Sequence, residues 1–456
     1  MNPIKKNTLC GIEISDMNNL GYGVGRIDGV VCFVADGVIG DSGTVRIIKS
    51  ASGYLVGKWE ERKHSSPMRS ASPCSAFPRC GGCSFCHVDY SLERKIKTDY
   101  VIHQMKKEHL DVRVIAPEES TVTSAYRNKA LIPIAEDKNG FCYSGFFATN
   151  THRAVKNDGC LLQPEIFSAI TLDFTDFLNR RNIKAYDEKT DRGVVRHLYL
   201  RSSGDHKSIM VCPVLRTLEG FDTVAFTEFA KKYTPYVKSV FVNIQPKTTN
   251  VVLGDKCIHL WGDTTIKDSL CGLDFDISPL SFYQINHHCA SRIYQKAAEL
   301  SGLDGTQTVF DLYCGTGTIG LSMAKKAKAL YGIEVVADAV ENARNNAKNN
   351  NIKNAEFICA DADDGIAALL KRGISPDLVV IDPPRKGTTP EFIKTVSKTS
   401  CNKVIYISCN PATLARDLAI FKENGFFCDT VYLYDMFPRT GHVESVVCLT
   451  RSDKAT

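Results

Sequence analysis

Long hydrophobic runs are missing from this sequence of 456 residues. No uninterrupted apolar stretch approaches the roughly 18 residues that indicate a membrane-spanning helix, so we expect no membrane contact. The N-terminal run MNPIKKNTLC lacks the apolar segment of a secretory signal, which favours a cytoplasmic location. A strong excess of one charge is missing too. The 56 Lys and Arg residues face 51 Asp and Glu residues, and a net charge of +5 is compatible with a nucleic-acid partner without establishing one.

Internal repeats and low-complexity tracts are absent as well. The composition, with 43% hydrophobic and 23% charged residues, is that of an ordinary globular protein and excludes a disordered or fibrous one. A chain of 456 residues is about three times the usual domain length, which predicts two or three domains.

Cysteine, by contrast, is abundant, with 18 residues. Most stand singly inside apolar runs such as VVCFV and SVVCLT, where a cysteine usually behaves as a small buried hydrophobic residue. Without an export signal, this pattern predicts free thiols in a reducing compartment and not a disulfide framework. The cluster CSAFPRCGGCSFC is different, because closely spaced thiolates suit either zinc or an iron–sulfur cluster. Spacing alone does not separate these two.

Residues 1–62 contain short alternating strands separated by turn glycines, which predicts a small β-barrel. Residues 63–275 begin with a Pro- and Ser-rich linker and then mix helical with strand-like runs, which predicts a central α+β domain carrying the cysteine cluster. A basic amphipathic helix is expected at 91–109, and its apolar side consists of Leu92, Ile96, Val101 and Met105. The boundary at 275 is left open, because this helix could instead pack on the domain that follows.

Residues 276–456 alternate strands with helices in a regular order. The strand-like runs are TVFDLYCG, ALYGIEV, AEFICAD, LVVIDPP, KVIYISCN and SVVCLT, and helical runs lie between the first five of them. This alternation predicts an α/β fold with a doubly wound, Rossmann-like parallel sheet, in which ligands bind at the carboxyl ends of the strands.

A glycine loop follows the first of these strands. Gly315, Gly317 and Gly320 match GxGxxG, and Glu334 ends the next strand. This pattern is typical of a dinucleotide site such as that for NAD. The same geometry suits S-adenosylmethionine, because glycines let a cofactor approach the backbone and the acid can receive ribose hydroxyls.

Three more acids end strands near this loop: Asp311, Asp361 and Asp382. Acids at four successive strand ends suit a cofactor with a positively charged amino-acid end, and not a pyrophosphate. The alternative is that each acid merely caps the helix that follows it. Four acids beside one glycine loop favour a methyltransferase over a dehydrogenase.

Cys409 lies between a predicted strand and a predicted helix. Asn410 can serve as the N-cap of that helix and Pro411 as its first residue. Cys409 then precedes a helix N-terminus, where the dipole and free N–H groups favour a thiolate. At the ligand edge of the sheet it is a candidate nucleophile. Cys314, inside the glycine loop, is interpreted as a packing residue.

Five motifs together resemble the RNA uracil-5-methyltransferase family. They are SFYQIN, DLYCGTGTIG, IDPPRKG, ISCNPATLARD and PRTGHVESVVCL, and their order and spacing over the C-terminal half are more specific than any one of them. Residues 21–41 resemble a TRAM domain, an RNA-binding barrel of the OB type. In such a barrel the candidate phosphate contacts would be Lys49, Lys58, Arg62 and Lys63.

The family resemblance implies a mechanism. The Cys409 thiolate would add to carbon 6 of uracil, carbon 5 would take the methyl group of S-adenosylmethionine, and Glu444 would remove the carbon-5 proton as general base. The cofactor-binding residues implied in the same way are Gln284, Tyr313, Glu334, Asp361 and Asp382.

The resemblance also implies a metal centre. Cys74, Cys80, Cys83 and Cys160 resemble the 4Fe–4S ligands of the ribosomal-RNA members of the family, with Cys86 as an alternative to Cys160. A structural or RNA-positioning role is expected for the cluster, since uracil methylation needs no electron transfer.

The expected function is methylation of carbon 5 of a uridine in 23S ribosomal RNA by a monomer, with the uridine unidentified. A transfer-RNA enzyme is the nearest alternative, although the barrel and the four cysteines argue against its compact forms. A non-catalytic RNA-binding assembly factor is disfavoured by the presence of Cys409 and Glu444. A radical-S-adenosylmethionine methylthiotransferase would need the spacing CxxxCxxC, which the cysteine cluster does not provide.

Overall fold

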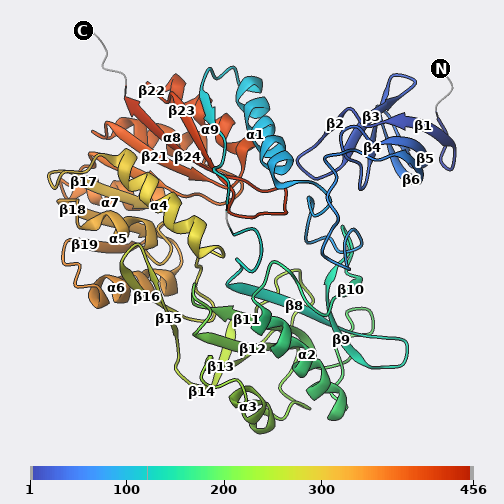
Figure 1. Ribbon diagram of the computed structural model, residues 1–456. Helices are drawn as coiled ribbons and strands as arrows, with labels where there is room; N and C mark the ends of the chain where they lie inside the picture. The colour runs from blue at the N-terminus through green and yellow to red at the C-terminus, as the bar shows by residue number, and fades with distance from the viewer. Residues whose placement is uncertain (1–3, 121, 452–456) are drawn as a thin grey trace.

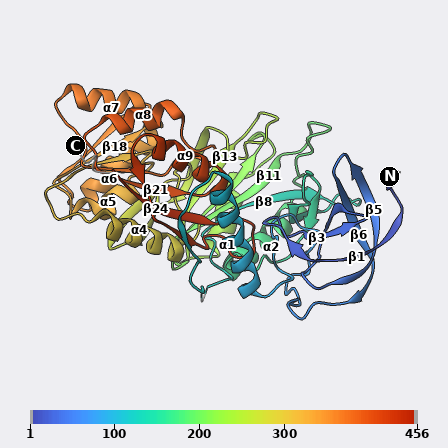
Figure 2. The same cartoon turned by 90° about the horizontal axis from the view of Figure 1, so that it is seen from above.

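Three parts follow one another along the computed structural model, which describes residues 4–120 and 122–451. In Figure 1 the N-terminal strands (blue) and the C-terminal sheet (orange to red) lie apart at the top, and the central part (green) lies below them. Figure 2 shows the N-terminal strands and the C-terminal sheet at opposite ends of an elongated molecule. The predicted domains also include residues 1–3, 121 and 452–456, which lie outside the described residues.

The N-terminal part is a six-stranded sheet in the order β1-β5-β6-β4-β3-β2. β1 pairs with β5, and β2, which continues the same stretch of chain, pairs with β3, so the sheet closes on itself. Ile12, Val34 and Val45 fill its interior. The predicted β-rich N-terminal domain is therefore confirmed. Its strands are β1 (Leu9–Glu13), β2 (Asp16–Met17), β3 (Gly23–Ile27), β4 (Val30–Val34), β5 (Ser42–Ala51) and β6 (Tyr54–His64).

An irregular segment with the clustered cysteines leads from the barrel to α1 (Tyr90–Lys107), close to the predicted helix. The buried face of α1 is the predicted one. Leu92 packs in one cluster with Met17 of β2, whereas Val101 belongs to the core of the C-terminal sheet. β7 (Arg113–Ile115) then pairs with β23 at the edge of that sheet. This stretch, which precedes the central sheet in the sequence, thus belongs to the C-terminal layer in space.

The central part is a seven-stranded sheet in the order β10-β9-β8-β11-β12-β13-β14. The helices α2 (Glu165–Arg180) and α3 (Thr223–Lys231) pack on it through a cluster of buried phenylalanines. A hairpin, β15 and β16, and the helix α4 (His287–Ser301) lead on to the C-terminal part. The strands are β8 (Lys129–Glu136), β9 (Cys142–Phe147), β10 (Ala154–Lys156), β11 (Val195–Ser202), β12 (Ile209–Leu215), β13 (Val237–Ile244), β14 (Lys256–Gly262), β15 (Ile266–Leu270) and β16 (Leu273–Ile277).

The C-terminal sheet has the order β19-β18-β17-β20-β21-β24-β23-β7, with β22 paired to β24. β17 to β21 run parallel, as predicted, and β24 runs antiparallel to β21. Its strands are β17 (Thr308–Leu312), β18 (Ala329–Glu334), β19 (Ala355–Cys359), β20 (Leu378–Ile381), β21 (Lys403–Ser408), β22 (Phe426–Phe427), β23 (Thr430–Tyr434) and β24 (Glu444–Arg451). Its helices are α5 (Thr318–Ala324), α6 (Ala337–Asn349), α7 (Ala362–Lys371), α8 (Pro390–Lys398) and α9 (Pro411–Glu423).

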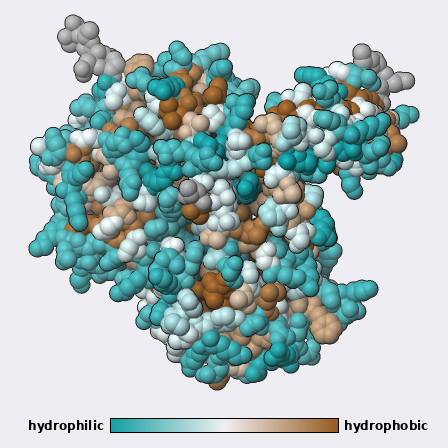
Figure 3. Space-filling model, viewed as in Figure 1, coloured by the Kyte–Doolittle hydropathy of each residue, from teal (hydrophilic) through white to brown (hydrophobic). Residues whose placement is uncertain are grey.

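The strand order reverses at β17, which has β18 on one side and β20 on the other. Such a switch point leaves a crevice at the carboxyl ends of the strands, where doubly wound sheets bind their ligands. Figure 3 shows a mostly hydrophilic face with a notch between the barrel and the C-terminal part. Within the described ranges, none of the helices has the length and apolar character needed to cross a membrane.

Candidate active site

The glycine loop lies at the switch point, between β17 and α5. Tyr313, Gly315 and Gly317 all have positive φ angles, of 64°, 54° and 80°. A Cβ atom on Gly317 would lie 3.1 Å from the ring of Phe357, whereas one on Gly315 would meet no atom within 4 Å. The loop is therefore packed tightly on one side and open on the other, as close approach of a ligand to the backbone requires.

Two of the strand-end acids hold this loop in place. The Asp311 carboxylate is fully buried and accepts a hydrogen bond of 2.9 Å from the Gly320 N–H, while its second oxygen has no partner. Glu334 accepts a hydrogen bond of 3.1 Å from the Gly315 N–H. Asp311 was expected to be free to meet the ammonium group of a cofactor, and the structure instead places it beneath the loop with one oxygen unsatisfied.

The other two acids differ from each other. Asp361 is the N-cap of α7 and accepts a hydrogen bond of 3.2 Å from the Asp363 N–H, so the helix-cap interpretation holds for this acid. Asp382 caps no helix, and its carboxylate receives no hydrogen bond from any described residue. Burial raises the pKa of Asp382 to about 7. Asp382 is thus a half-buried acid that lacks a partner.

Tyr313 and Gln284 border the same crevice. The ring of Tyr313 packs against that of Phe392, and burial together with the Asp361 carboxylate raises the pKa of Tyr313 to about 12. Gln284 hydrogen-bonds with Tyr294, whose hydroxyl lies 3.1 Å from Thr318 Oγ1 at the start of α5. The five predicted cofactor-binding residues therefore line one edge of the sheet.

Cys409 and Glu444 lie at the same end of two neighbouring strands. β21 ends at Ser408, which pairs with Ser445 of β24, so Cys409 follows directly after this ladder and Glu444 is the first residue of β24. The two side chains lie close enough for the Glu444 carboxyl to raise the pKa of the Cys409 thiol. The predicted local structure is confirmed, because Asn410 caps α9 and Pro411 is its first residue.

Burial and the neighbouring carboxyl groups favour the protonated forms of both Cys409 and Glu444. Burial, with the Asp382 carboxyl adding to it, raises the pKa of Glu444 to about 8. Burial and the Glu444 and Asp382 carboxyls raise the pKa of Cys409 to about 11. This shift is opposite to the one expected from the helix N-terminus. Asp311 also has a pKa raised to about 7, chiefly by burial, so carboxyl groups predominate at this corner of the sheet.

Arg385 is a further candidate site residue, which the sequence analysis did not identify. Its guanidinium lowers the pKa values of both Cys409 and Glu444, and one of its nitrogens lies 3.5 Å from His442 Nε2. Its backbone oxygen accepts a hydrogen bond of 2.9 Å from the side chain of Asn410. Its position three residues after Asp382 in the motif IDPPRKG was the available signal.

The clustered cysteines lie near one another without converging on a point. Among the described residues, no group of three or more His, Cys, Asp or Glu side chains is arranged to hold a metal ion. The Cys83 thiol hydrogen-bonds with that of Cys86, and this bond and burial raise its pKa. Burial, with Cys83 and Cys80 adding to it, raises the pKa of Cys160 to about 11. Cys74 and Cys80 pack beside the same apolar residues.

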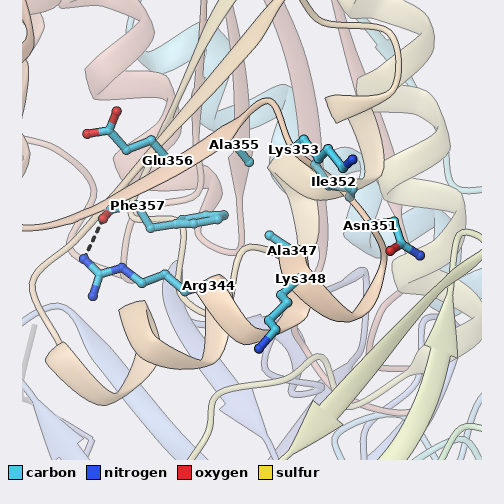
Figure 4. A pocket seen from close by; sticks show the side chains of 9 residues that line it. All are labelled: Arg344, Ala347, Lys348, Asn351, Ile352, Lys353, Ala355, Glu356 and Phe357. Atoms are coloured by element: carbon cyan, nitrogen blue, oxygen red, sulfur yellow. Dashed lines mark hydrogen bonds between the residues drawn. The ribbon is translucent and has the colours of Figure 1, made fainter.

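A separate surface hollow lies outside this crevice. Figure 4 shows this hollow, of about 610 Å³, at the end of α6 and the start of β19, where Arg344 donates a hydrogen bond to the backbone oxygen of Phe357. It includes Lys348 and Lys353 but none of the predicted site residues. This hollow lies where β19 begins, whereas the glycine loop follows the end of β17, so it is separate from the crevice.

Comparison with solved structures defines the class of protein. The fold superposes on the crystal structure of the Pyrococcus abyssi tRNA (uracil-54, C5)-methyltransferase in complex with S-adenosyl-L-homocysteine, with a TM-score of 0.76 and 26% identity. The match covers 96% of this chain and 99% of that one. The fold, the glycine loop and the acidic strand ends are those of an S-adenosylmethionine-dependent methyltransferase.

Comparison with known sequences gives the family. An RNA methyltransferase of Clostridium acetobutylicum, described as uncharacterized, is 36% identical over 456 residues, which cover 99% of each chain. One of Oceanobacillus iheyensis is 38% identical over 98% of each chain. The profile of the tRNA (Uracil-5-)-methyltransferase family matches residues 272–452. The chain belongs to the RNA uracil-5-methyltransferase family.

Proposed function

We propose that this protein methylates carbon 5 of a uridine in 23S ribosomal RNA through a covalent bond between Cys409 and carbon 6 of the base. The observation that carries the proposal is the proximity of Cys409 and Glu444 at the end of the ladder between β21 and β24. A nucleophile and a buried acid with a pKa near 8 stand together at the ligand edge of a methyltransferase sheet.

The proposed chemistry balances at each step. The Cys409 thiolate forms a bond to carbon 6, and the electrons of the carbon 5–carbon 6 double bond move to give an enolate, which makes carbon 5 nucleophilic. The methyl group would pass from the sulfonium of bound S-adenosylmethionine to carbon 5, with the electron pair of the broken sulfur–methyl bond staying on the sulfur to leave S-adenosyl-L-homocysteine. The Glu444 carboxylate then takes the proton from carbon 5, the double bond re-forms, and the bond to sulfur breaks to release Cys409 as a thiolate.

The acids of the crevice fit a cationic cofactor. Asp311 has a buried oxygen without a partner, and burial leaves Asp382 with a raised pKa and no hydrogen bond from a described residue. S-Adenosylmethionine carries an ammonium and a sulfonium group, and either would favour the ionised carboxylates. Its proposed contacts are Gln284, Tyr313, Glu334, Asp361 and Asp382.

A 4Fe–4S cluster on Cys74, Cys80, Cys83 and Cys160 is part of the proposal. The donor set fits such a cluster, because thiolates are its ligands and these four thiols lie near one another: Cys74 and Cys83 raise the pKa of Cys80, and Cys80 and Cys83 raise that of Cys160. The hydrogen bond between Cys83 and Cys86 keeps Cys86 as the alternative fourth ligand. The free thiols suit a reducing cytoplasm.

The N-terminal barrel is proposed to be a TRAM domain that binds RNA, in a protein that acts as a monomer. Lys58 and Lys63 are exposed on or near β6 and suit phosphate contacts. Arg62 is less suited, because its guanidinium lies 3.0 Å from Asp36 and 3.3 Å from Asp41 within the barrel.

Transfer RNA is a second candidate substrate. The Pyrococcus abyssi protein, a tRNA (uracil-54, C5)-methyltransferase, matches 96% of this chain, so the similarity includes the barrel region. The barrel therefore does not by itself separate a ribosomal-RNA enzyme from a transfer-RNA enzyme.

Release of tritium from RNA that carries 5-tritiated uridine tests both the chemistry and the substrate. Unmodified 23S ribosomal RNA and transfer RNA are assayed side by side with S-adenosylmethionine. We expect release from ribosomal RNA, and none with Cys409→Ala. Release from transfer RNA alone would keep the chemistry and overturn the ribosomal substrate. Absence of release from both, with the cofactor bound, would favour an assembly factor without turnover.

A further inference from the structure

Nine residues connect β23 to the proposed base, and buried residues from other parts of the chain hold them. The connecting segment, residues 435–443, runs from the end of β23 to Glu444, the first residue of β24. No described residue gives the Glu444 side chain a hydrogen bond, and the side chain is buried. Its position is therefore set by its backbone, which pairs with Tyr434 of β23 and continues directly from the connecting segment.

A buried lysine of α1 contacts both an acid of its own helix and the connecting segment. Lys97 Nζ lies 2.7 Å from Glu93 Oε1, one turn earlier on α1, and 2.7 Å from Asp435 Oδ1 in the connecting segment. The side chains of Lys97 and Glu93 are fully buried, and that of Asp435 is 2% exposed. Lys97 also donates a hydrogen bond of 3.3 Å to the Phe437 oxygen. One ammonium group thus joins α1 to two points of the connecting segment.

Glu93 holds a third point of the same segment. Its Oε1 accepts a hydrogen bond of 2.7 Å from the Arg439 N–H. Arg439 has a φ angle of 70°, which is unfavourable for a residue with a side chain and persists only where the surroundings impose it. Its backbone oxygen accepts hydrogen bonds from the N–H groups of Ser84 and Phe85, at 2.8 and 3.1 Å. The strained residue is therefore held from both sides.

Stability alone does not account for this arrangement. Two carboxylates and one ammonium lose their hydration when they are buried, and apolar side chains of the same volume often stabilise a core equally well. The best-attested use of buried ionic groups is to select one arrangement of the chain among several. Here the selected arrangement is that of the connecting segment, which leads directly to Glu444.

We propose that Lys97 and Glu93 are positioning residues for the reaction, which act by holding the connecting segment so that Glu444 points at carbon 5 of the target base. This inference rests on the proposed function. It concerns the step after methyl transfer, because only proton removal depends on the position of Glu444. A displaced base slows this step, and the covalent enzyme–RNA intermediate then accumulates.

The test measures tritium release and covalent adduct in the same reactions, with the full chain. The charge-free variant Glu93→Gln/Lys97→Met/Asp435→Asn keeps the side-chain shapes and leaves no buried charge unpaired. The single variant Asp435→Asn, which weakens the contact between the segment and Lys97, is the second probe. If the triple variant does not fold, the inference is judged on the result with Asp435→Asn. The matched control is Lys95→Met, because Lys95 lies exposed on the same helix and pairs only with Asp99.

We expect the triple variant to release tritium about 10²-fold more slowly, since small misplacements of a reacting group have effects of this size. Denaturing gels should show adduct accumulating as in Glu444→Gln, with unchanged KM values for RNA and S-adenosylmethionine. Lys95→Met should match the unmodified protein. Unchanged tritium release in a folded variant, or slower release without adduct, would overturn the inference. Absence of adduct in Glu444→Gln itself would overturn the proposed function and the inference together.

Discussion

At the scale of single residues, buried acids dominate the candidate site. Asp311, Asp382 and Glu444 all have pKa values raised by burial to about 7 or 8. Arg385 lowers the pKa values of Cys409 and Glu444 but offsets their shifts only in part. A cationic ligand is the natural complement to such a site, and its binding would favour the ionised forms.

The two proposed reacting residues give opposite phenotypes. Glu444→Gln should slow tritium release by about 10²–10⁴-fold, the range typical of a lost general base, and should accumulate an enzyme–RNA adduct on denaturing gels. Cys409→Ala should release no tritium and form no adduct, because it lacks the nucleophile. A stable adduct formed by Cys409→Ala would exclude the assignment.

The buried Glu444 also predicts how stability depends on pH. Its pKa rises from 4.5 to about 8 on folding, so the folded state holds a proton that the unfolded state loses between these values. The Glu444 contribution therefore lowers the free energy of unfolding as the pH rises from about 4 to about 8.

Urea unfolding at pH 6 and pH 9 measures this effect, and Glu444→Gln should lose this part of the pH dependence. Between these two pH values the Glu444 contribution should not exceed about 3 kcal/mol, since about two pH units of this range lie below the folded-state pKa and each is worth about 1.36 kcal/mol. The exposed Glu423→Gln serves as the control and should behave as the unmodified protein. An identical pH dependence in all three proteins would show that Glu444 is ionised in the folded state.

At the scale of elements, the glycine loop depends on one close contact. Gly317→Ala places a Cβ atom 3.1 Å from the Phe357 ring and also requires a φ angle of 80°. Gly373→Ala is the matched control, because Gly373 has a φ angle of 74° but open space around it.

We expect Gly373→Ala to lower the free energy of unfolding by about 1–2 kcal/mol, the cost of a left-handed conformation. Gly317→Ala should lower the free energy of unfolding by more than this. In calorimetry Gly317→Ala should bind S-adenosyl-L-homocysteine more weakly, while Gly373→Ala should bind it as the unmodified protein does. Equal losses in the two variants would mean that the contact with Phe357 has no effect.

The sequence predicted the positions of individual helices and strands better than it predicted which of them pair or pack with one another. The five parallel strands and α1 are present where the hydrophobic periodicity placed them, and the caps of α9 are the predicted ones. β7 was not anticipated, because a strand of three residues has too few positions to show alternation. The proximity of Cys409 to Glu444 depends on the antiparallel register of β24, which pairs residues distant in sequence and leaves no local pattern.

At the scale of the whole molecule, the elements that hold the base come from the N-terminal half of the chain. Backbone groups of Ser84 and Phe85, beside Cys83, hydrogen-bond to Arg439, and α1 supplies the buried ion pairs. A Cβ atom on Gly441 would lie only 2.0 Å from the Asn19 oxygen, so the barrel also touches this segment closely. The sequence analysis left open that α1 packs on the C-terminal domain, but no motif indicates that the barrel and residues 84–85 also contact this segment.

The exposed lysines of the barrel test its role in RNA binding. The double variant Lys58→Gln/Lys63→Gln should bind RNA more weakly. The slope of log K against log salt concentration should become shallower by roughly 0.7 for each lost contact with a single-strand phosphate. Lys371→Gln, an exposed lysine at the end of α7, is the control. At saturating RNA the rate of tritium release should not change. An unaltered salt dependence would exclude these lysines as phosphate contacts.

The point at which RNA attaches to the protein tests the central claim most directly. Glu444→Gln is incubated with RNA and S-adenosylmethionine and digested with protease and ribonuclease, and the nucleotide-bearing peptide is identified by mass spectrometry. We predict a methylated uridine nucleotide on the peptide that contains Cys409. Attachment at Cys314, or no nucleotide-bearing peptide from folded protein with bound cofactor, would contradict the account.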